Sequence, residues 1–273
     1  MARSILVTGC SSGIGRDAAL HLHALGWRVF AACRKPADCD ALRALGFAAP
    51  LIDYERPDTI ASGLDAVLDA TGGTLDALFN NGAYAIPGLV EDLPGPALSA
   101  ILQANVVGWH DLTRRALPVM RARGQGRIVQ CSSVLGFVAA PWRGAYVASK
   151  FALEGLTDTL RLELRGSGIH VSLIQPGPVR TAFRRNARAQ FERWIDWRAS
   201  PNADRYGALL ERFGSEAPDR FEVPPRAVTD ALLRALTDRR PRARYRVTAP
   251  TRVATIARRA LSTRMLDTIL SRN

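Results

Sequence analysis

Short segments that are apolar at nearly every position alternate along this chain with longer segments of helical periodicity. Examples of the short segments are ILV at residues 5–7, VFAA at 29–32 and IVQC at 128–131. A strand with hydrophobic side chains at successive positions is buried on both faces, as in a parallel sheet covered by helices on each side. The alternation therefore predicts an α/β fold with a doubly wound parallel sheet of six or seven strands and helices on both faces.

The expected elements follow this rhythm through most of the chain. Strands are expected at residues 4–8, 28–33, 48–53, 75–80, 127–133 and 170–175, and helical spacing indicates helices at 16–25, 59–70, 97–120 and 147–165. With 273 residues, of which 47% are hydrophobic, the chain can bury one large core. We expect a single domain over residues 1–273.

Two segments depart from the rhythm. Residues 182–222 mix aromatic side chains with many arginines just after the sixth expected strand, so we expect an irregular, substrate-covering insertion over the strand ends. Residues 249–271 place apolar side chains at helical spacing with arginines between them. We interpret them as a C-terminal helical tail that packs on the core or between subunits, with a membrane-bound helix as the alternative.

Composition limits the classes of partner. The net charge of +12 would suit a nucleic-acid or acidic membrane surface, but the arginines are scattered without interleaved aromatic residues, so no nucleic-acid partner is expected. No apolar run approaches the roughly 20 residues that span a bilayer, so no integral membrane association is expected either. The N-terminus runs directly into a strand-like segment without a secretion signal, which favours a cytoplasmic location. The four cysteines lack CxxC spacing, so we expect reduced thiols and neither a disulfide nor a metal site.

A glycine-rich loop, TGCSSGIG at residues 8–15, lies between the first strand and the first helix. At this position glycines let the backbone approach a pyrophosphate, and the helix N-terminus offers N–H groups to it. The spacing is GxxxGxG, whereas the widespread dinucleotide fingerprint is GxGxxG. The strand before the loop and the helix after it favour a nucleotide site over an ordinary tight turn.

The end of the second strand indicates which nucleotide. NAD sites carry an acidic residue here to bind the adenosine ribose, but this chain has Cys33 followed by Arg34 and Lys35. A guanidinium can bind a 2′-phosphate in a bidentate fork, so the cofactor expected is NADP(H). The alternative is that the two residues are solvated surface cations.

Four polar residues suggest acid/base chemistry. Tyr146 and Lys150 are four residues apart, so they lie on one helix face, where the cation would lower the pKa of the phenol. Ser133 lies at the carboxyl end of the fifth expected strand, where a hydroxyl could donate to a substrate carbonyl. Asn105 falls on the apolar face of the long helix and could pass protons outward or be a satisfied core amide.

Taken together, these motifs resemble the short-chain dehydrogenase/reductase family in its single-domain branch, which has a Rossmann fold. The resemblance covers residues 4–181 and includes the glycine loop, the Asn-Asn-Gly segment, YxxxK with serine thirteen residues earlier, and PGPVRT. NNGAYAIPG and GRGAYVASKFALEGL are most similar to bacterial NADP-dependent aldehyde/ketone reductases related to retinol and hydroxysteroid dehydrogenases. One departure is Gly82-Ala83, where the family has Ala-Gly.

The resemblance implies a role for each matching residue. Tyr146 would be the general acid/base, Lys150 would lower its pKa and hold the nicotinamide ribose, Ser133 would orient the carbonyl and Asn105 would support the proton relay. Further cofactor contacts would come from the phosphate loop (Gly9, Ser11, Ser12, Gly13, Ile14, Gly15), the 2′-phosphate site (Arg34, Lys35), the adenine side (Asp53), the adenosine ribose (Asn80, Asn81, Gly82) and the nicotinamide (Pro176, Gly177, Val179, Thr181).

The function expected is reversible hydride transfer between NADP(H) and a lipophilic aldehyde or ketone. The pocket would be apolar, lined by aromatic residues of the insertion, namely Phe183, Phe191, Trp194, Trp197 and Phe213. Family habit implies a homodimer or homotetramer. The alternatives are a non-catalytic NADP sensor on the same fold, and a basic membrane-surface or nucleic-acid-binding protein.

Overall fold

The computed structural model describes residues 2–215 and 217–271 and contains one six-stranded sheet. All neighbouring strands are parallel, in the order β2-β1-β3-β4-β5-β6. The strands are β1 (Ser4–Thr8), β2 (Arg28–Ala32), β3 (Ala77–Asn80), β4 (Gly126–Cys131), β5 (Ile169–Gln175) and β6 (Arg244–Arg246). The order reverses beside β1, so the predicted doubly wound α/β (Rossmann) fold is confirmed.

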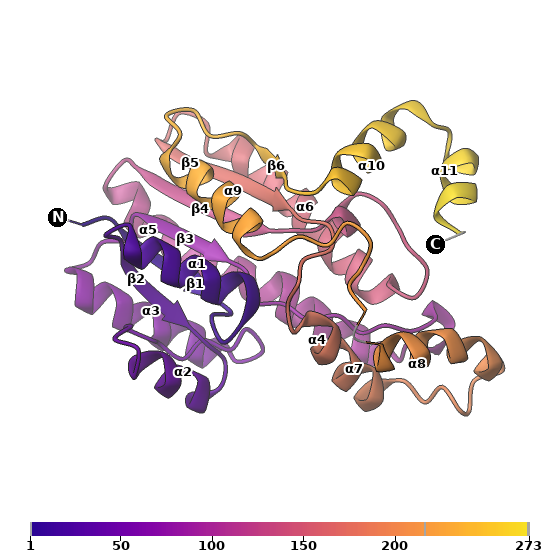
Figure 1. Cartoon of the computed structure of the whole chain (residues 1–273). Coiled ribbons are helices and arrows are strands. Elements are labelled where there is room, and N and C mark those ends of the chain that lie inside the picture. The colour runs from indigo at the N-terminus through magenta and orange to yellow at the C-terminus, as the bar shows by residue number, and fades with distance from the viewer. Residues whose placement is uncertain (1, 216, 272–273) are drawn as a thin grey trace.

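Helices cover both faces of the sheet (Figure 1). On one face α1 (Gly13–Ala24) packs against α9 (Arg226–Thr237), and on the other α3 (Pro57–Thr71) packs against α5 (Gly108–Ala122). The long helix α6 (Gly144–Glu163) packs on β5, while α2 (Pro36–Arg43) lies beside β2. Strands β1 and β3 are buried along their whole length, which explains their largely apolar sequences.

The strand expected at residues 48–53 is not formed. The segment makes only isolated parallel bridges to the β2 side, from Ala48 to Phe30 and from Leu51 to Cys33. Pro50 lies between the two bridges, and its backbone has no N–H to donate to a ladder. Its carbonyl still accepts a hydrogen bond from the Cys33 backbone at 3.3 Å. The segment therefore lies along the edge of a six-stranded sheet without adding a strand.

The helix expected at residues 97–120 is interrupted. It consists of α4 (Gly95–Leu102), a π-helical turn η2 (Gln103–Val107) and α5. The π turn carries Asn105 at its centre, and such turns often occur at functional sites because they redirect one side chain. A further close approach follows at Gly108, where an added Cβ would lie 2.5 Å from the Tyr54 carbonyl oxygen.

The insertion at residues 182–222 is mostly helical and not irregular as expected. It contains α7 (Phe183–Trp194), the short turn η4 (Ala203–Tyr206) and α8 (Gly207–Gly214). Their apolar side chains pack with residues 84–104 in a second hydrophobic cluster that is separate from the core around the sheet. In Figure 1 this cover lies beyond the carboxyl ends of the strands. Two further short turns are η1 (Val90–Asp92) and η3 (Val134–Gly136).

The C-terminal tail forms two helices, α10 (Ala249–Ala260) and α11 (Thr263–Leu270), with Ser262 capping the second. Its apolar face does not pack on the core within the described residues, because Val253 and Ile256 are 65% and 68% exposed. Packing between subunits, the other part of the expectation, stays a prediction. Exposed arginines flank Val253 and Ile256. No helix within the described residues is both long enough and apolar enough to cross a membrane.

Candidate active site

The predicted site residues meet at the carboxyl ends of β1, β3, β4 and β5. Two hydrogen bonds fix the loops that leave these strands. The Asn81 side chain after β3 donates to the Thr8 carbonyl at the end of β1, at 3.0 Å. The Val134 backbone after β4 donates to the Pro176 carbonyl after β5, at 2.8 Å. In an open parallel sheet the ligand site lies at this edge, beside the point where the strand order reverses.

The glycine loop is closely packed against its neighbours. Gly9 has φ +71°, and an added Cβ would lie 2.6 Å from Cα of Gly82. An added Cβ at Gly15 would lie 2.3 Å from the Gly9 carbonyl oxygen, and one at Gly13 would lie 2.8 Å from the Thr181 side chain. The loop therefore has room only for glycine at these positions. Gly82, where this chain departs from the family pattern, abuts Gly9, and an added Cβ at Gly82 would lie 3.3 Å from the Gly9 Cα.

The first turn of α1 is open to a ligand. Ser12 is the N-cap residue, and within the described residues its side chain makes no capping hydrogen bond. Ser11 and Ser12 are exposed, while Ile14 packs against the sheet core. The N–H groups at this helix end are thus placed for an anion, as the glycine motif predicts.

The adenosine side of the site carries two exposed cations. Arg34 and Lys35 follow β2 and are both exposed, and Lys35 is the N-cap residue of α2. Asp53 is half-buried, and its carboxylate accepts a hydrogen bond from the Glu55 backbone at 3.1 Å. Asp53 therefore helps to order the turn before α3. Its expected contact with the adenine stays a prediction.

Asn80 differs from the role expected for it. Its side chain is fully buried, accepting from the Tyr54 hydroxyl at 2.6 Å and donating to Thr113 at 3.0 Å. These bonds tie β3 to α5 and to the turn before α3, so the Asn80 side chain does not face a ribose. Its neighbour Asn81 is half-buried at the strand end. The Asn81 amide makes a different contact, with the Thr8 carbonyl at the end of β1.

Lys150 is buried, with 1% of its surface exposed. Its ammonium donates to the Cys131 carbonyl at 2.8 Å and lies 4.3 Å from the centroid of the Trp109 ring. Burial lowers the pKa of Lys150 to about 8, with Cys131 and Glu154 acting in the opposite direction. The helix thus holds an ammonium that gives up its proton more readily than an exposed lysine.

Tyr146 lies one turn before Lys150, and its ring centroid is 5.6 Å from the ammonium nitrogen. Burial raises the pKa of Tyr146 above its ordinary value, and a hydrogen bond from Ser133 acts in the opposite direction. Desolvation of the phenolate is therefore the largest influence on this pKa, and the expected lowering of the pKa by Lys150 stays a prediction. Ser133 is also fixed by accepting from the Leu135 backbone at 3.1 Å.

Asn105 is fully buried and bound on all sides. Its amide donates to the Tyr84 carbonyl at 2.8 Å and to the Ser149 hydroxyl at 3.1 Å, and its oxygen accepts from the Tyr84 backbone at 3.2 Å. Ser149 in turn donates to the Tyr146 carbonyl at 2.8 Å. Asn105 therefore links the loop after β3 to helix α6, which carries Tyr146. Its hydrogen bonds are to Tyr84 and Ser149, whereas the Lys150 ammonium is bound by the Cys131 carbonyl.

The loop that begins at Pro176 closes the site on the β5 side. An added Cβ at Gly177 would lie 2.3 Å from the Thr248 hydroxyl, so this loop packs tightly on the start of α10. Val179 forms an isolated bridge with Val223 before α9. Thr181 lies against the glycine loop and accepts from the Phe183 backbone at 3.2 Å. The phosphate loop and the predicted nicotinamide loop are therefore in contact.

Behind Lys150 is a charged network that the sequence analysis missed. Glu154 is 7% exposed and accepts from Gln175 at 2.9 Å and from Arg244 at 3.1 Å. Arg244 also pairs with Asp158 at 2.6 Å, so β6 is joined to two turns of α6. The one signal in the sequence was the spacing of Glu154, four residues after Lys150 on the same helix face.

The cover brings one aromatic ring to Tyr146. Phe183 at the start of α7 lies edge-on to Tyr146, with the ring centroids 5.4 Å apart. Phe191 is instead buried within the cover, next to Tyr206 and Phe213. Of the aromatic residues expected to line the pocket, Phe183 therefore contacts Tyr146, whereas Phe191 packs inside the cover. The partly buried residues of the cluster include Phe183, Trp194, Trp197 and Phe213.

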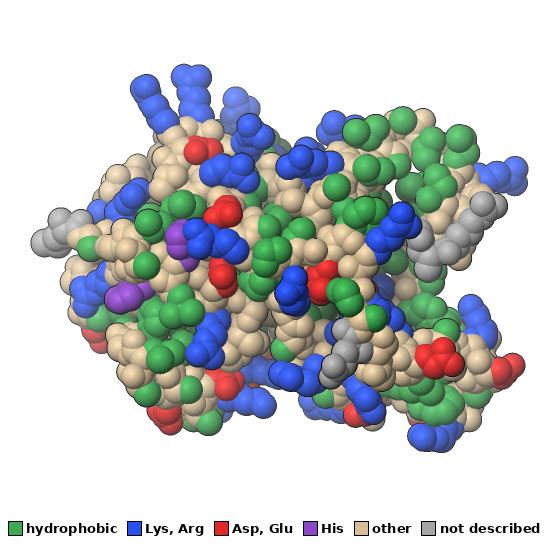
Figure 2. Space-filling model, in the orientation of Figure 1, with side chains coloured by type: hydrophobic (Ala, Val, Ile, Leu, Met, Phe, Trp, Pro, Cys, Tyr) green, Lys and Arg blue, Asp and Glu red, His purple; other side chains and the backbone are tan. Residues whose placement is uncertain are grey.

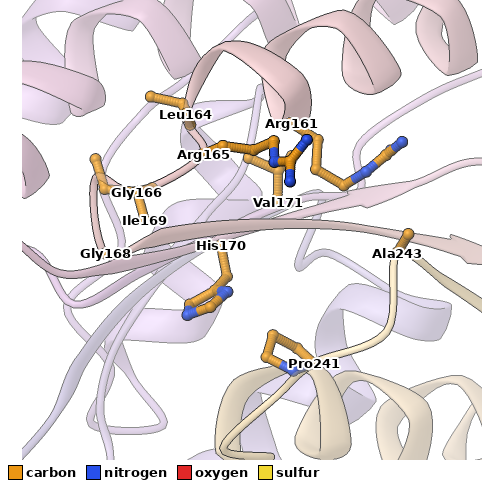
Figure 3. Close-up of a pocket in the computed structure, with 10 residues that line it drawn as sticks. All are labelled: Arg161, Leu164, Arg165, Gly166, Gly168, Ile169, His170, Val171, Pro241 and Ala243. Atoms are coloured by element: carbon orange, nitrogen blue, oxygen red, sulfur yellow. The ribbon is translucent and has the colours of Figure 1, made fainter.

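Figure 3 shows a pocket at the opposite edge of the sheet. It has a volume of about 280 Å³ and is lined by Arg161, Arg165 and His170, at the amino end of β5, and by Pro241 before β6. None of the predicted site residues lines it. We therefore place the functional site at the carboxyl edge, where the polar residues converge.

Comparison with known proteins agrees with this geometry. Residues 3–192 match a family model described as short chain dehydrogenase. The chain is 40% identical over 270 residues to the uncharacterized oxidoreductase YbbO of Escherichia coli K12, covering 99% of this chain and 94% of that protein. It is 34% identical to human 17-beta-hydroxysteroid dehydrogenase type 1, covering 90% and 77%. A short chain dehydrogenase/reductase from Burkholderia phymatum, solved in complex with NAD, superposes with a TM-score of 0.79 at 26% identity, covering 100% and 96%.

Proposed function

The chain belongs to the short-chain dehydrogenase/reductase family of oxidoreductases, and from that membership we propose reversible hydride transfer between NADP(H) and an aldehyde or ketone. The observation that carries the proposal is the grouping of Ser133, Tyr146 and Lys150 at the edge of the sheet where the glycine loop opens. A protein that only senses the nucleotide has no need of this grouping.

The residues present fit a nicotinamide dinucleotide. Gly9, Gly13 and Gly15 form a cradle in which any side chain would meet neighbouring atoms, and the first turn of α1 is open beside them. These groups would hold the pyrophosphate, with Pro176 to Thr181 on the nicotinamide side. The site therefore has the parts that a dinucleotide requires.

The choice of NADP over NAD rests on the end of β2. A carboxylate there would repel a 2′-phosphate, and this chain instead presents exposed Arg34 and Lys35. Since a neighbour of the same fold was solved with NAD, the fold alone does not select the cofactor. The two cations favour the phosphorylated form.

The bound nicotinamide ring supplies the hydride, and the protein supplies the proton and the position. The Tyr146 phenol would donate its proton to the carbonyl oxygen, and its raised pKa keeps it protonated at neutral pH, the form that can donate. Ser133 would donate a hydrogen bond to the same oxygen. The Lys150 ammonium, held nearby, would stabilise the phenolate that remains. A protonated phenol is the form that the reduction direction requires.

The substrate class proposed is a lipophilic carbonyl compound. Phe183 lies against Tyr146, and the cover that carries it packs through aromatic side chains. Such surroundings exclude water and favour apolar substrates. The relatives include a hydroxysteroid dehydrogenase, which supports the same class.

We also propose that the protein is a homodimer or homotetramer. Leu156 and Leu162 on α6 are 47% and 59% exposed, and Val107 just before α5 is 48% exposed. Exposed apolar side chains on neighbouring long helices are typical of an interface between copies. Measuring the mass in solution tests this proposal.

The proposed reaction is tested by following NADPH and NADH oxidation with a panel of aldehydes, ketones and steroids. The wild-type protein should reduce lipophilic carbonyls with NADPH. Tyr146→Phe should lose at least about a hundredfold in kcat/KM because the proton donor is gone. NADPH binding, measured by fluorescence, should be retained in the variant.

Two outcomes would contradict the proposal. Undiminished turnover by Tyr146→Phe would exclude the phenol as the acid. NADPH binding by the wild-type protein without reduction of any carbonyl would favour the sensor alternative. Comparison with Ser133→Ala, which should lose about tenfold to a thousandfold, separates the acid from the oxygen-orienting residue.

A further inference from the structure

The two C-terminal helices form an arm that stands off from the body of the protein. Helix α10 starts at the carboxyl end of β6 and α11 turns back from its tip (Figure 1). Within the described residues the arm touches the body along one side of α10, at the loop around Gly177 and, through Arg258, near η3 and α6. Most of the surface of α10 and α11 is therefore available to a partner.

Helix α10 has an inner and an outer face. Thr251 is fully buried, and seven residues later Arg258 donates to the Phe137 carbonyl and lies 5.4 Å from the ring of Phe151. Residues seven apart share a helix face, so this is the side turned to the body. Val253 and Ile256, three apart, lie on the opposite side and are 65% and 68% exposed.

The exposed apolar face continues onto α11. Met265 in its first turn is 54% exposed, and Leu261 and Leu266 on either side of it are partly exposed. Figure 2 shows hydrophobic side chains gathered over α10 and α11, with basic side chains beside them. Monomeric proteins rarely expose apolar side chains in such a group unless the surface binds something.

The arm is also basic. Residues 249–271 contain four arginines and a single acidic residue, Asp267. Arg252, Arg259 and Arg264 are exposed, and none of them forms an ion pair within residues 2–215 and 217–271. The partner of this surface must therefore accept apolar side chains and offer negative charge at the same place.

Charge complementarity decides between two occupants. A second copy of the chain that paired arm to arm would bring arginines together with one aspartate on each side. An anionic bilayer offers lipid phosphates to the arginines and acyl chains to Val253, Ile256 and Met265. We propose that α10 and α11 form a peripheral binding element for anionic membrane surfaces. The proposal concerns binding alone and stands whether or not the enzymatic function holds.

The test is co-sedimentation of the full chain with vesicles, without any turnover. Vesicles of phosphatidylcholine with about one part in three of phosphatidylglycerol should retain the protein at least about twentyfold more tightly than pure phosphatidylcholine. Val253→Ser/Ile256→Ser should lower the partition at least about tenfold because two apolar anchors are lost. Arg252→Glu/Arg259→Glu should lower it at least about twentyfold.

Matched controls keep the test specific to the arm. Leu25→Ser/Leu45→Ser replaces two apolar residues that are also half-exposed, and Arg239→Glu/Arg240→Glu changes the net charge equally at another exposed site. The vesicle partition of both controls should stay within about threefold of wild type. Charges far from the arm act on the membrane only at long range, where salt screens them. Circular dichroism and thermal unfolding confirm that each variant is folded.

Three outcomes would overturn the proposal. They are equal binding to neutral and anionic vesicles, equal losses in the arm and control variants, or no vesicle binding by the wild-type protein. If Val253→Ser/Ile256→Ser dissociates an oligomer and leaves vesicle binding unchanged, the apolar face is an interface between copies and not a membrane surface.

Discussion

The Lys150 ammonium lies 4.3 Å from the centroid of the Trp109 ring, in the space between α6 and α5. The ring faces a cation that is otherwise bound by the Cys131 carbonyl at 2.8 Å. A cation–π contact of this kind is stabilising once the cation has been desolvated. The two residues together keep a charged group at the floor of the site despite its burial.

The pH dependence of stability should report the pKa of Lys150. Burial lowers that pKa from 10.5 to about 8, so the folded protein binds fewer protons than the unfolded chain between those values. Stability contributed by this group therefore rises with pH across the window, and the cost of the buried charge is fully present below about pH 8. In Lys150→Met the cost is absent.

Denaturant unfolding of both proteins checks this expectation. The free energy of unfolding of wild type relative to Lys150→Met should rise by about 3 kcal/mol between pH 8 and pH 10.5. Titrating groups that do not interact with Lys150 cancel in the difference. Parallel pH profiles for the two proteins would show that Lys150 titrates in the folded state as it does in water.

Cofactor choice should depend on Arg34. Arg34→Ala removes a charged hydrogen-bond donor to the 2′-phosphate, so kcat/KM for NADPH should fall about tenfold to a hundredfold. The value for NADH should change less than about twofold, because NADH has no phosphate there. Arg240→Ala, an exposed arginine distant in sequence, serves as the control. An equal loss with both cofactors would assign Arg34 to stability and not to phosphate binding.

The aromatic contact between Phe183 and Tyr146 should affect the turnover of lipophilic substrates more than the stability of the fold. Phe183→Ala removes the ring that lies 5.4 Å from Tyr146, so kcat/KM for a lipophilic ketone should fall about threefold to tenfold. Small aldehydes should be affected less, since they need less apolar cover. Phe221→Ala, at a 57% exposed phenylalanine, should have no effect on either substrate. Equal losses for large and small carbonyls would argue that Phe183 orients Tyr146 instead.

Two glycines provide a paired test of the phosphate loop. At Gly15 an added Cβ would lie 2.3 Å from the Gly9 carbonyl oxygen, whereas at Gly155 in α6 nothing lies within 4 Å. Gly15→Ala should destabilise the protein by about 2 kcal/mol and weaken NADPH binding. Gly155→Ala should stabilise it by about 1 kcal/mol, since alanine favours a helix interior. Thermal unfolding with and without NADPH measures both effects.

Patterns in the sequence were sufficient for the strands and for the central residues of the site. Apolar runs such as those of β1 and β3 can be recognised in the sequence because both faces of a central strand are buried. Tyr146 and Lys150 could be paired because helical spacing of four residues places them on one face. These features depend on local geometry, which the order of residues fixes directly.

Where a proline or a π-helical turn altered the backbone, the same patterns were insufficient. Pro50 reduced an expected strand to two bridges, and the turn around Asn105 divided an expected helix. The apolar pattern of each segment was correct, but hydrogen bonding with its neighbours decided its form. These hydrogen bonds involve residues that are distant in the chain, so the pattern of a short sequence segment does not predict them.

The sequence by itself determined the sheet, the glycine loop and the identity of the residues at the site. Tertiary structure alone decided that burial raises the pKa of Tyr146, that the Asn80 side chain is enclosed between Tyr54 and Thr113, and that the apolar face of the arm is left exposed. The physical reason is that desolvation and packing depend on everything that surrounds a side chain, and most of those surroundings come from residues far away in the chain.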